Sequence, residues 1–227
     1  MTARAQLLFV LLLLPLAACA TARLEPGCAD NAMCAARAAE PRLLTQGRAE
    51  RQGGDLVLIP VHGERQVFTD NKQACDADDA NHCTGFALMG DFPKSNAWVV
   101  QQFYYEGGDF LLVDDRSGRQ IRLNGMPFFS SDGGRFLIAP YDDENDVGPN
   151  NLEIWRREGD GAVLEWAHPV KAAYQEDPSL KELYEARVMR WDKDRITLAF
   201  SEPGTQRHWS GTLMHDKDGW HLSAKSP

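Results

Sequence analysis

Oxygen-bearing side chains follow one another from residue 142 to residue 153 at a spacing that could bind a calcium ion. Asp142, Glu144, Asp146 and Glu153 stand at positions 1, 3, 5 and 12 of a calcium-loop register. Position 6 is Val147, whereas the sharp turn of such a loop requires glycine. Solvated loops between strands therefore explain these carboxylates better than calcium does, and we predict no bound metal.

Catalysis by a nucleophile or a metal lacks its usual motifs. The sequence contains no GxSxG pentapeptide, the motif that exposes a catalytic serine. Ser130 and Ser131 lie in a segment whose composition is typical of a hairpin turn. The six histidines form no HExxH, HxH or CxxCH motif, and no glycine-rich phosphate loop precedes a helix. We therefore predict a protein that is not an enzyme and uses no cofactor.

The five cysteines are Cys19, Cys28, Cys34, Cys75 and Cys83. The spacings CxxxxxC and CxxxxxxxC differ from the CxxC knuckle that holds zinc, so disulfides are favoured over a metal. If Cys19 is modified, an even number remains for two disulfides in an oxidising compartment. We favour Cys28 with Cys34 and Cys75 with Cys83, because each pair is close in sequence and brackets a polar loop. Crossed pairing is the alternative.

Residues 1–18 predict a secretory signal. Arg4 supplies a positive charge, and Leu7–Ala18 is an apolar run of 12 residues that ends in small side chains. As a helix this run is about 18 Å long, too short for a hydrocarbon core of about 30 Å. The segment is therefore interpreted as a signal peptide and not as a membrane-spanning anchor.

The stretch Leu16-Ala17-Ala18-Cys19 resembles the lipobox of bacterial lipoproteins. The resemblance implies that Cys19 is acylated and becomes the first residue of the mature chain, with more than one acyl chain making the anchor stable. Ala20, in place of an aspartate, resembles the pattern of lipoproteins sorted to the outer membrane. The resemblance thus implies a lipid-anchored protein of the outer membrane that faces the periplasm. An ordinary cleaved signal is the alternative.

The elements that follow begin with a short helix. The Ala-rich stretch Cys28–Glu40 predicts a helix stopped by Pro41, and the polar residues after it predict that 19–54 is a lipidated tether. Further along, Asp177 and Pro178 stand as the N-cap and first position of a helical insertion at 171–185.

From residue 55 to 227 the pattern is that of one all-β domain. Short apolar runs alternate with turns rich in glycine and aspartate, which predicts an antiparallel meander. The expected strands are 56–61, 65–69, 84–90, 97–105, 109–114, 119–123, 126–130, 135–140, 151–157, 162–167, 186–191, 195–200, 207–215 and 219–223.

The meander repeats itself with a unit of about 40 residues. The sequence of residues 129–139 is similar to that of residues 191–200, and the sequence of residues 152–161 is similar to that of residues 212–219. This resembles the blade of the β-propeller repeat families over residues 84–223. No Trp-Asp dipeptide closes a strand in the expected place, and residues 55–83 match no full unit. We predict a propeller-like, complete or incomplete meander, with a β-sandwich or barrel as the alternative.

The charge balance bears on partners. The chain has 24 Lys+Arg against 33 Asp+Glu, a net charge of −9, which argues against nucleic acid as the main partner. The six tryptophans and five tyrosines are expected mostly in the core. The stretch Gln101–Tyr105 leaves open which of its two sides faces solvent.

These observations favour a non-catalytic, periplasm-facing lipoprotein that binds another protein. A specific version is an immunity protein that neutralises a periplasmic toxin, since an acidic protein attracts a basic partner. One alternative is an envelope assembly or structural lipoprotein. The other is a propeller-type hydrolase or sugar-binding enzyme.

Overall fold

The structure is a computed structural model that describes residues 32–44, 47–139, 151–169, 185–201 and 205–224. These ranges contain two short α-helices, α1 (Ala32–Ala39) and α2 (Lys72–Asp76), and the 3-10 turns η1 (Glu40–Arg42) and η3 (Pro93–Ser95). The strands are β1 (Ala49–Gln52), β2 (Asp55–Leu58), β3 (Gln66–Thr69), β4 (Gly85–Phe92), β5 (Ala97–Phe103), β6 (Gly108–Asp114), β7 (Gln120–Leu123), β8 (Phe128–Phe129), β9 (Arg135–Ile138), β10 (Asn151–Glu158), β11 (Gly161–Pro169), β12 (Glu185–Asp192), β13 (Arg195–Ser201), β14 (His208–Asp216) and β15 (Gly219–Ala224). Among the described helices, none has the length and apolar character needed to cross a membrane.

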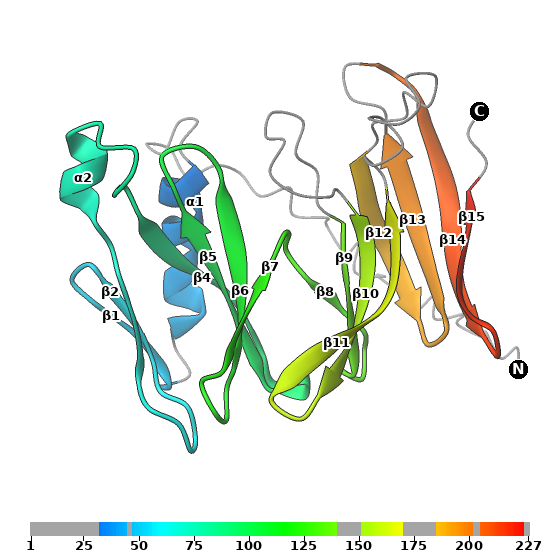
Figure 1. The fold of residues 1–227 in the computed structure, drawn as a ribbon, viewed down its shortest axis with the longest axis horizontal. Coiled ribbons are helices and arrows are strands. Elements are labelled where there is room, and N and C mark those ends of the chain that lie inside the picture. The colour runs from blue at the N-terminus through cyan, green and yellow to red at the C-terminus, as the bar shows by residue number, and fades with distance from the viewer. Residues whose placement is uncertain (1–31, 45–46, 140–150, 170–184, 202–204, 225–227) are drawn as a thin grey trace, which may run out of the picture.

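The strands form four antiparallel sheets, in each of which the strands follow one another in sequence (Figure 1). The first sheet is β1-β2-β3, the second β4-β5-β6-β7, the third β8-β9-β10-β11 and the fourth β12-β13-β14-β15. The predicted all-β antiparallel meander is therefore confirmed. The third and fourth sheets coincide with the two copies of the sequence repeat. In the described part of the chain the four sheets stay separate, and none closes on itself.

The second sheet is apolar on both faces and packs between its two neighbours. Trp98 and Val100 of β5 pack with Leu56 of β2 in one cluster, whereas Val99 packs with Phe136 of β9 in another. All five side chains are at most 1% exposed. Because alternate residues of a strand point to opposite faces, an unbroken apolar run is what a strand buried on both sides requires.

A third apolar layer joins the third sheet to the fourth. It includes Leu137 of β9 and Ile154 of β10 on one side, and Ile196, Leu198 and Trp220 on the other. Burial of each side chain of this size contributes about 1.5–3 kcal/mol. Three such layers hold the four sheets in a row.

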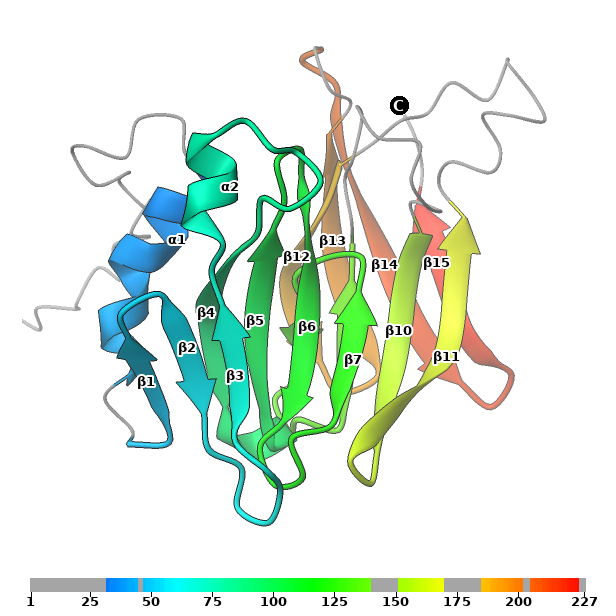
Figure 2. The ribbon, with the colours of Figure 1, turned by 60° about the vertical axis from the view of Figure 1, so that its left-hand side comes forward.

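The N-terminal part differs from the expected tether. Ala49–Gln52 is strand β1, paired antiparallel with β2, and α1 lies along the free edge of β4 (Figure 2). Arg37 donates to the carbonyl of Phe86, and the Leu88 N–H donates to Glu40. The folded part therefore includes α1, η1 and β1, and the expectation that a tether reaches residue 54 is wrong. Hydropathy could not identify β1, because in β1 only Ala49 is apolar.

Of the other expected elements, the N-terminal helix is present, and the helical insertion and the signal peptide lie outside the described residues. The predicted N-terminal helix is present as α1 over Ala32–Ala39, and residues 28–31 of the expected span lie outside the described residues. Pro41 lies within η1 and does not follow the helix directly. The predicted helical insertion at 171–185 lies outside the described residues, apart from Glu185 at the start of β12. The signal peptide with Cys19 also lies outside them.

Candidate functional site

An apolar groove lies between the second and third sheets, where β4 passes into η3 and the chain enters β8. Its volume is about 770 Å³, and its apolar wall is formed by Phe92, Met126, Pro127, Phe128 and Phe129. Met126 and Phe128 are 39% and 43% exposed. Exposed apolar side chains that gather in one groove mark a place where a soluble protein binds something.

The floor of the apolar groove is supported by aromatic contacts. The Phe92 and Phe129 rings are 4.4 Å apart between centroids, and Phe129 contacts Phe136 at 5.5 Å. Phe136 in turn stacks on Trp155 at 6.2 Å. The groove is thus built on the buried layer between the second and third sheets, which keeps its shape fixed before any partner arrives.

The two loops beside the apolar groove hold each other. The ammonium group of Lys94 in η3 donates a hydrogen bond to the carbonyl oxygen of Ser131 at 2.9 Å. Gly133, in the β8–β9 turn, has φ of +75°, and a Cβ there would lie 2.4 Å from the carbonyl oxygen of Lys94. Only glycine allows this close approach, so the turn fixes the distance between the two sides of the groove.

Asp91 also lines the apolar groove, and its carboxylate is poorly solvated. Burial raises the pKa of the Asp91 carboxyl, while the guanidinium of Arg48 opposes this shift and Asp115 adds to it. Oδ1 of Asp91 is buried and accepts no hydrogen bond from the residues that the structure describes. A buried acceptor without a donor carries an uncompensated desolvation cost.

Replacing Asp91 by asparagine should stabilise the protein at neutral pH, because the amide avoids the cost of a poorly solvated carboxylate. The pKa of the Asp91 carboxyl is higher in the folded protein than its ordinary value of 3.8. The protonated carboxyl therefore contributes its full stability below pH 3.8, and this contribution is lost as the pH rises through the folded-state pKa. The advantage of Asp91→Asn over the wild type should therefore grow with pH in that window. Urea denaturation of both proteins from about pH 3 to pH 7 measures it, and an advantage that shrinks with rising pH would contradict the assignment.

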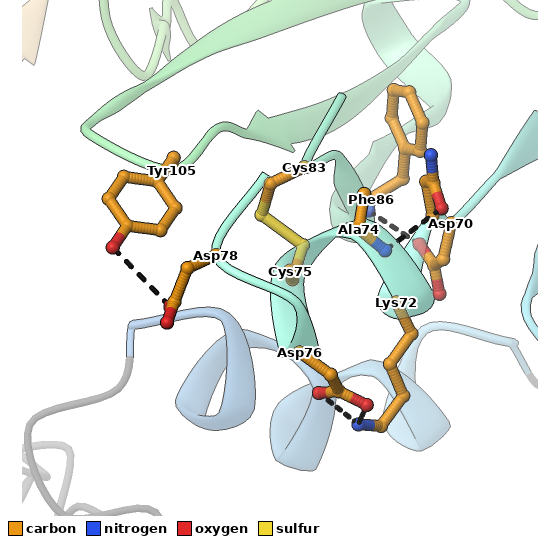
Figure 3. Close-up of a disulfide and its surroundings, with 10 residues drawn as sticks. Asp70, Lys72, Ala74, Cys75, Asp76, Asp78, Cys83, Phe86 and Tyr105 are labelled. Carbon is orange, nitrogen blue, oxygen red and sulfur yellow. Dashed lines mark hydrogen bonds and ion pairs between the residues drawn. A yellow bond between two sulfur atoms is a disulfide. The ribbon is translucent and has the colours of Figure 1, made fainter. Parts of the chain in front are cut away.

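The cysteines in the described ranges are all bonded. Cys75 and Cys83 form a disulfide that joins α2 to the segment before β4, which is the pairing favoured from the sequence (Figure 3). Cys34 is disulfide-bonded as well. Its predicted partner Cys28 and the predicted lipid-bearing Cys19 lie outside the described residues.

The proposed calcium ligands divide between two parts of the chain. Glu153 lies within β10, is buried, and accepts the indole N–H of Trp155 at 2.8 Å. Asp142, Glu144 and Asp146 lie outside the described residues. In the described ranges, no three His, Cys, Asp or Glu side chains form a group that could hold a metal ion.

Ser130 performs a structural task in the β8–β9 turn. Its hydroxyl donates to Asp132 at 2.7 Å, and the Arg135 N–H donates to it at 3.0 Å. Together with the Gly134 N–H, this hydroxyl lowers the pKa of the Asp132 carboxyl. The hairpin-turn interpretation of this segment therefore agrees with the geometry.

The apolar groove was not foreseen from the sequence. Residues 126–130 predict a strand, yet only Phe128 and Phe129 form β8, and Met126 stays exposed outside it. The available signal was Pro127: proline cannot donate to a ladder, so it shortens a strand and leaves its neighbours free. No spacing rule connects this segment with Phe92, because the two meet only through the stacking of the sheets.

No protein-family model matches this chain, and a search of curated protein sequences finds no match either. The apolar groove and its polar neighbours are therefore the features from which a function is inferred.

Proposed function

We propose that this protein is a non-catalytic lipoprotein, anchored through Cys19 in the outer membrane and facing the periplasm, that binds another protein through the apolar groove. The observation that carries the proposal is the groove itself, with Met126 and Phe128 exposed on a fixed aromatic floor. The lipobox Leu16–Cys19 supports the location.

The partner is a basic protein that inserts an apolar segment with a neighbouring cationic or amide donor. The chain carries a net charge of −9, which steers a basic partner toward it. Asp91 lines the groove beside the apolar wall and adds a negative charge there. An immunity protein that captures a basic periplasmic toxin is the specific form of this proposal.

The scaffold of this binding protein is an incomplete propeller-like stack. The second, third and fourth sheets each run through four strands in sequence order, and successive sheets bury their facing sides. The first sheet has three described strands, which fits a shortened end unit. In such a stack binding surfaces form between neighbouring sheets, which is where the apolar groove lies.

Binding should depend on the two exposed side chains of the apolar groove. The soluble Cys19→Ser form is expressed in the periplasm of its own host and used to capture a basic partner in stoichiometric amount. The affinity between this form and the partner is then measured by calorimetry. The Met126→Ser/Phe128→Ser variant should bind at least about tenfold more weakly, because apolar anchors in a groove carry most of the binding energy.

The matched control is Val163→Ser/Leu164→Ser, which removes two apolar side chains of β11 that are each 44% exposed and lie outside the groove. This control should bind as the parent does. Equal affinity of the groove variant and the parent would show that the partner binds elsewhere. If the protein captures no polypeptide with micromolar or tighter affinity, the proposed protein-binding function is wrong.

A further inference from the structure

A second cavity lies at the other end of β5, beside the disulfide Cys75–Cys83. Its volume is about 550 Å³, which is in the range of small-molecule pockets. We call it the disulfide pocket. Its walls come from the start of α1, the two cysteines and the hairpin that joins β5 to β6. Figure 3 shows Tyr105 on that hairpin opposite the disulfide loop.

The disulfide pocket has a neutral lining. Of the described residues that line it, none carries a charged side chain, although 25% of the whole chain is charged. The lining combines the aromatic rings of Phe103, Tyr104 and Tyr105 with the amide of Gln101 and with backbone at Gly107. A site without a countercharge disfavours ions, because the desolvation of an ion would go uncompensated.

Two tyrosines at the disulfide pocket are held differently. Tyr104 donates its hydroxyl to Asp109 at 3.0 Å, and Asp109 is paired with Arg122 at 3.1 Å, so the phenol is fixed. Tyr105 is 47% exposed, and its hydroxyl reaches Asp78 at 3.5 Å. One ring therefore belongs to the wall, and the other presents an accessible surface at the rim.

The walls of the disulfide pocket are set before a ligand binds. Gly85 of β4 lies so close to α1 that a Cβ there would come 2.2 Å from Sδ of Met33. Gly107 has φ of +81°, which lets the β5–β6 hairpin turn tightly. The disulfide fixes the third wall. Preorganised walls lower the cost of ordering a ligand site.

We infer that the disulfide pocket binds a neutral saccharide, with Tyr105 as the stacking surface and Gln101 as a hydrogen-bonding group. A sugar ring offers a flat apolar C–H face and a rim of hydroxyls, which matches an exposed aromatic ring beside a side chain that both donates and accepts. This site is separate from the apolar groove, because the groove lies at η3 before β5 and the disulfide pocket lies after β5. The two assignments can therefore fail independently.

The test is calorimetric titration of the full-length Cys19→Ser protein with chitotetraose, cellotetraose and maltotetraose. At least one of these should bind with a dissociation constant below about 1 mM. Tyr105→Ala should weaken that binding at least about tenfold. Ala32→Trp, which places an indole at an exposed position of the wall, should abolish it. Val163→Ser on β11, an exposed position outside both the groove and the disulfide pocket, is the control and should leave sugar binding unchanged.

Three results would overturn the inference. The first is saturable binding of none of the three sugars. The second is sugar binding that Tyr105→Ala and Ala32→Trp leave unaltered, which would place the sugar elsewhere. The third is binding of arginine amide in preference to every sugar with the same sensitivity to Tyr105→Ala, which would make the disulfide pocket a cation site.

Discussion

Replacing Arg157 by methionine should lower the free energy of unfolding by about 3–5 kcal/mol, because the change leaves a buried carboxylate without its cation. Arg157 and Asp114 join the third sheet to the second through an N–O distance of 2.7 Å, and their side chains are 8% and 1% exposed. Arg157 also donates to the carbonyls of Ser95 and Gly161 at 3.2 and 2.7 Å. All three acceptors would lose a donor at once.

The measurement is urea denaturation followed by tryptophan fluorescence. Arg119→Met is the matched control, because Arg119 pairs with Asp160 at 2.9 Å between side chains that are 61% and 47% exposed. An exposed pair of this kind is worth about 0–1 kcal/mol. If Arg157→Met cost no more than Arg119→Met, the link between the sheets would not depend on the buried pair. The double variant Asp114→Asn/Arg157→Met should recover part of the loss, since no uncompensated charge then remains buried and the amide oxygen still accepts from the N–H groups of Arg116 and Ser117.

The strands could be predicted from the sequence because their physical signals are local. The strand β6 is an apolar run that ends in Asp114, and the turn after it is closed by the N–H groups of Arg116 and Ser117, which donate to that carboxylate. Gly118 at φ of +79° completes the turn. Each of these preferences acts within a few residues, so the pattern alone was sufficient.

Elements stabilised by distant partners could not be predicted. The strand β1 consists of Ala49-Glu50-Arg51-Gln52, which has no apolar alternation, and it forms because β2 pairs with it. The helix α2 has only five residues, too few to show a helical period, and its Cys75 is bonded to Cys83 in the segment before β4. Local preference carries no information about such partners.

The same limit applies to both candidate sites. Gln101 and Tyr105 lie on one side of an alternating stretch, but whether that side faces solvent depends on where α1 lies. Phe92 and Phe128 are 36 positions apart in the chain and form one groove only because the second sheet stacks on the third. Sequence patterns identify faces of single strands, whereas a pocket requires the distances between sheets.

Replacing Glu40 by alanine should cost about 3 kcal/mol, because the change leaves the buried N–H of Leu88 without its acceptor and removes the carboxylate that pairs with Arg51. The partly buried guanidinium of Arg51 keeps the carbonyls of Gly54 and Phe86 as acceptors. Glu40 is 3% exposed. Its carboxylate accepts from the Leu88 N–H at 2.8 Å and from Arg51 at 2.6 and 3.0 Å. These bonds cover the free edge of β4, which would otherwise present unpaired backbone groups to other chains. Hydrogen exchange at Leu88 and urea denaturation measure the loss.

Two further variants separate the covering of the β4 edge from a general effect of charge. Glu40→Gln keeps an acceptor for Leu88 and should lose less stability than Glu40→Ala. Glu50→Ala removes a carboxylate that pairs with Arg65 between side chains 46% and 56% exposed, and should cost about 1 kcal/mol or less. If the β4 edge is what Glu40 protects, Glu40→Ala alone should also show association that increases with protein concentration. Fast exchange at Leu88 without loss of global stability would mean instead that α1 and η1 open locally, and that the four sheets hold together without them.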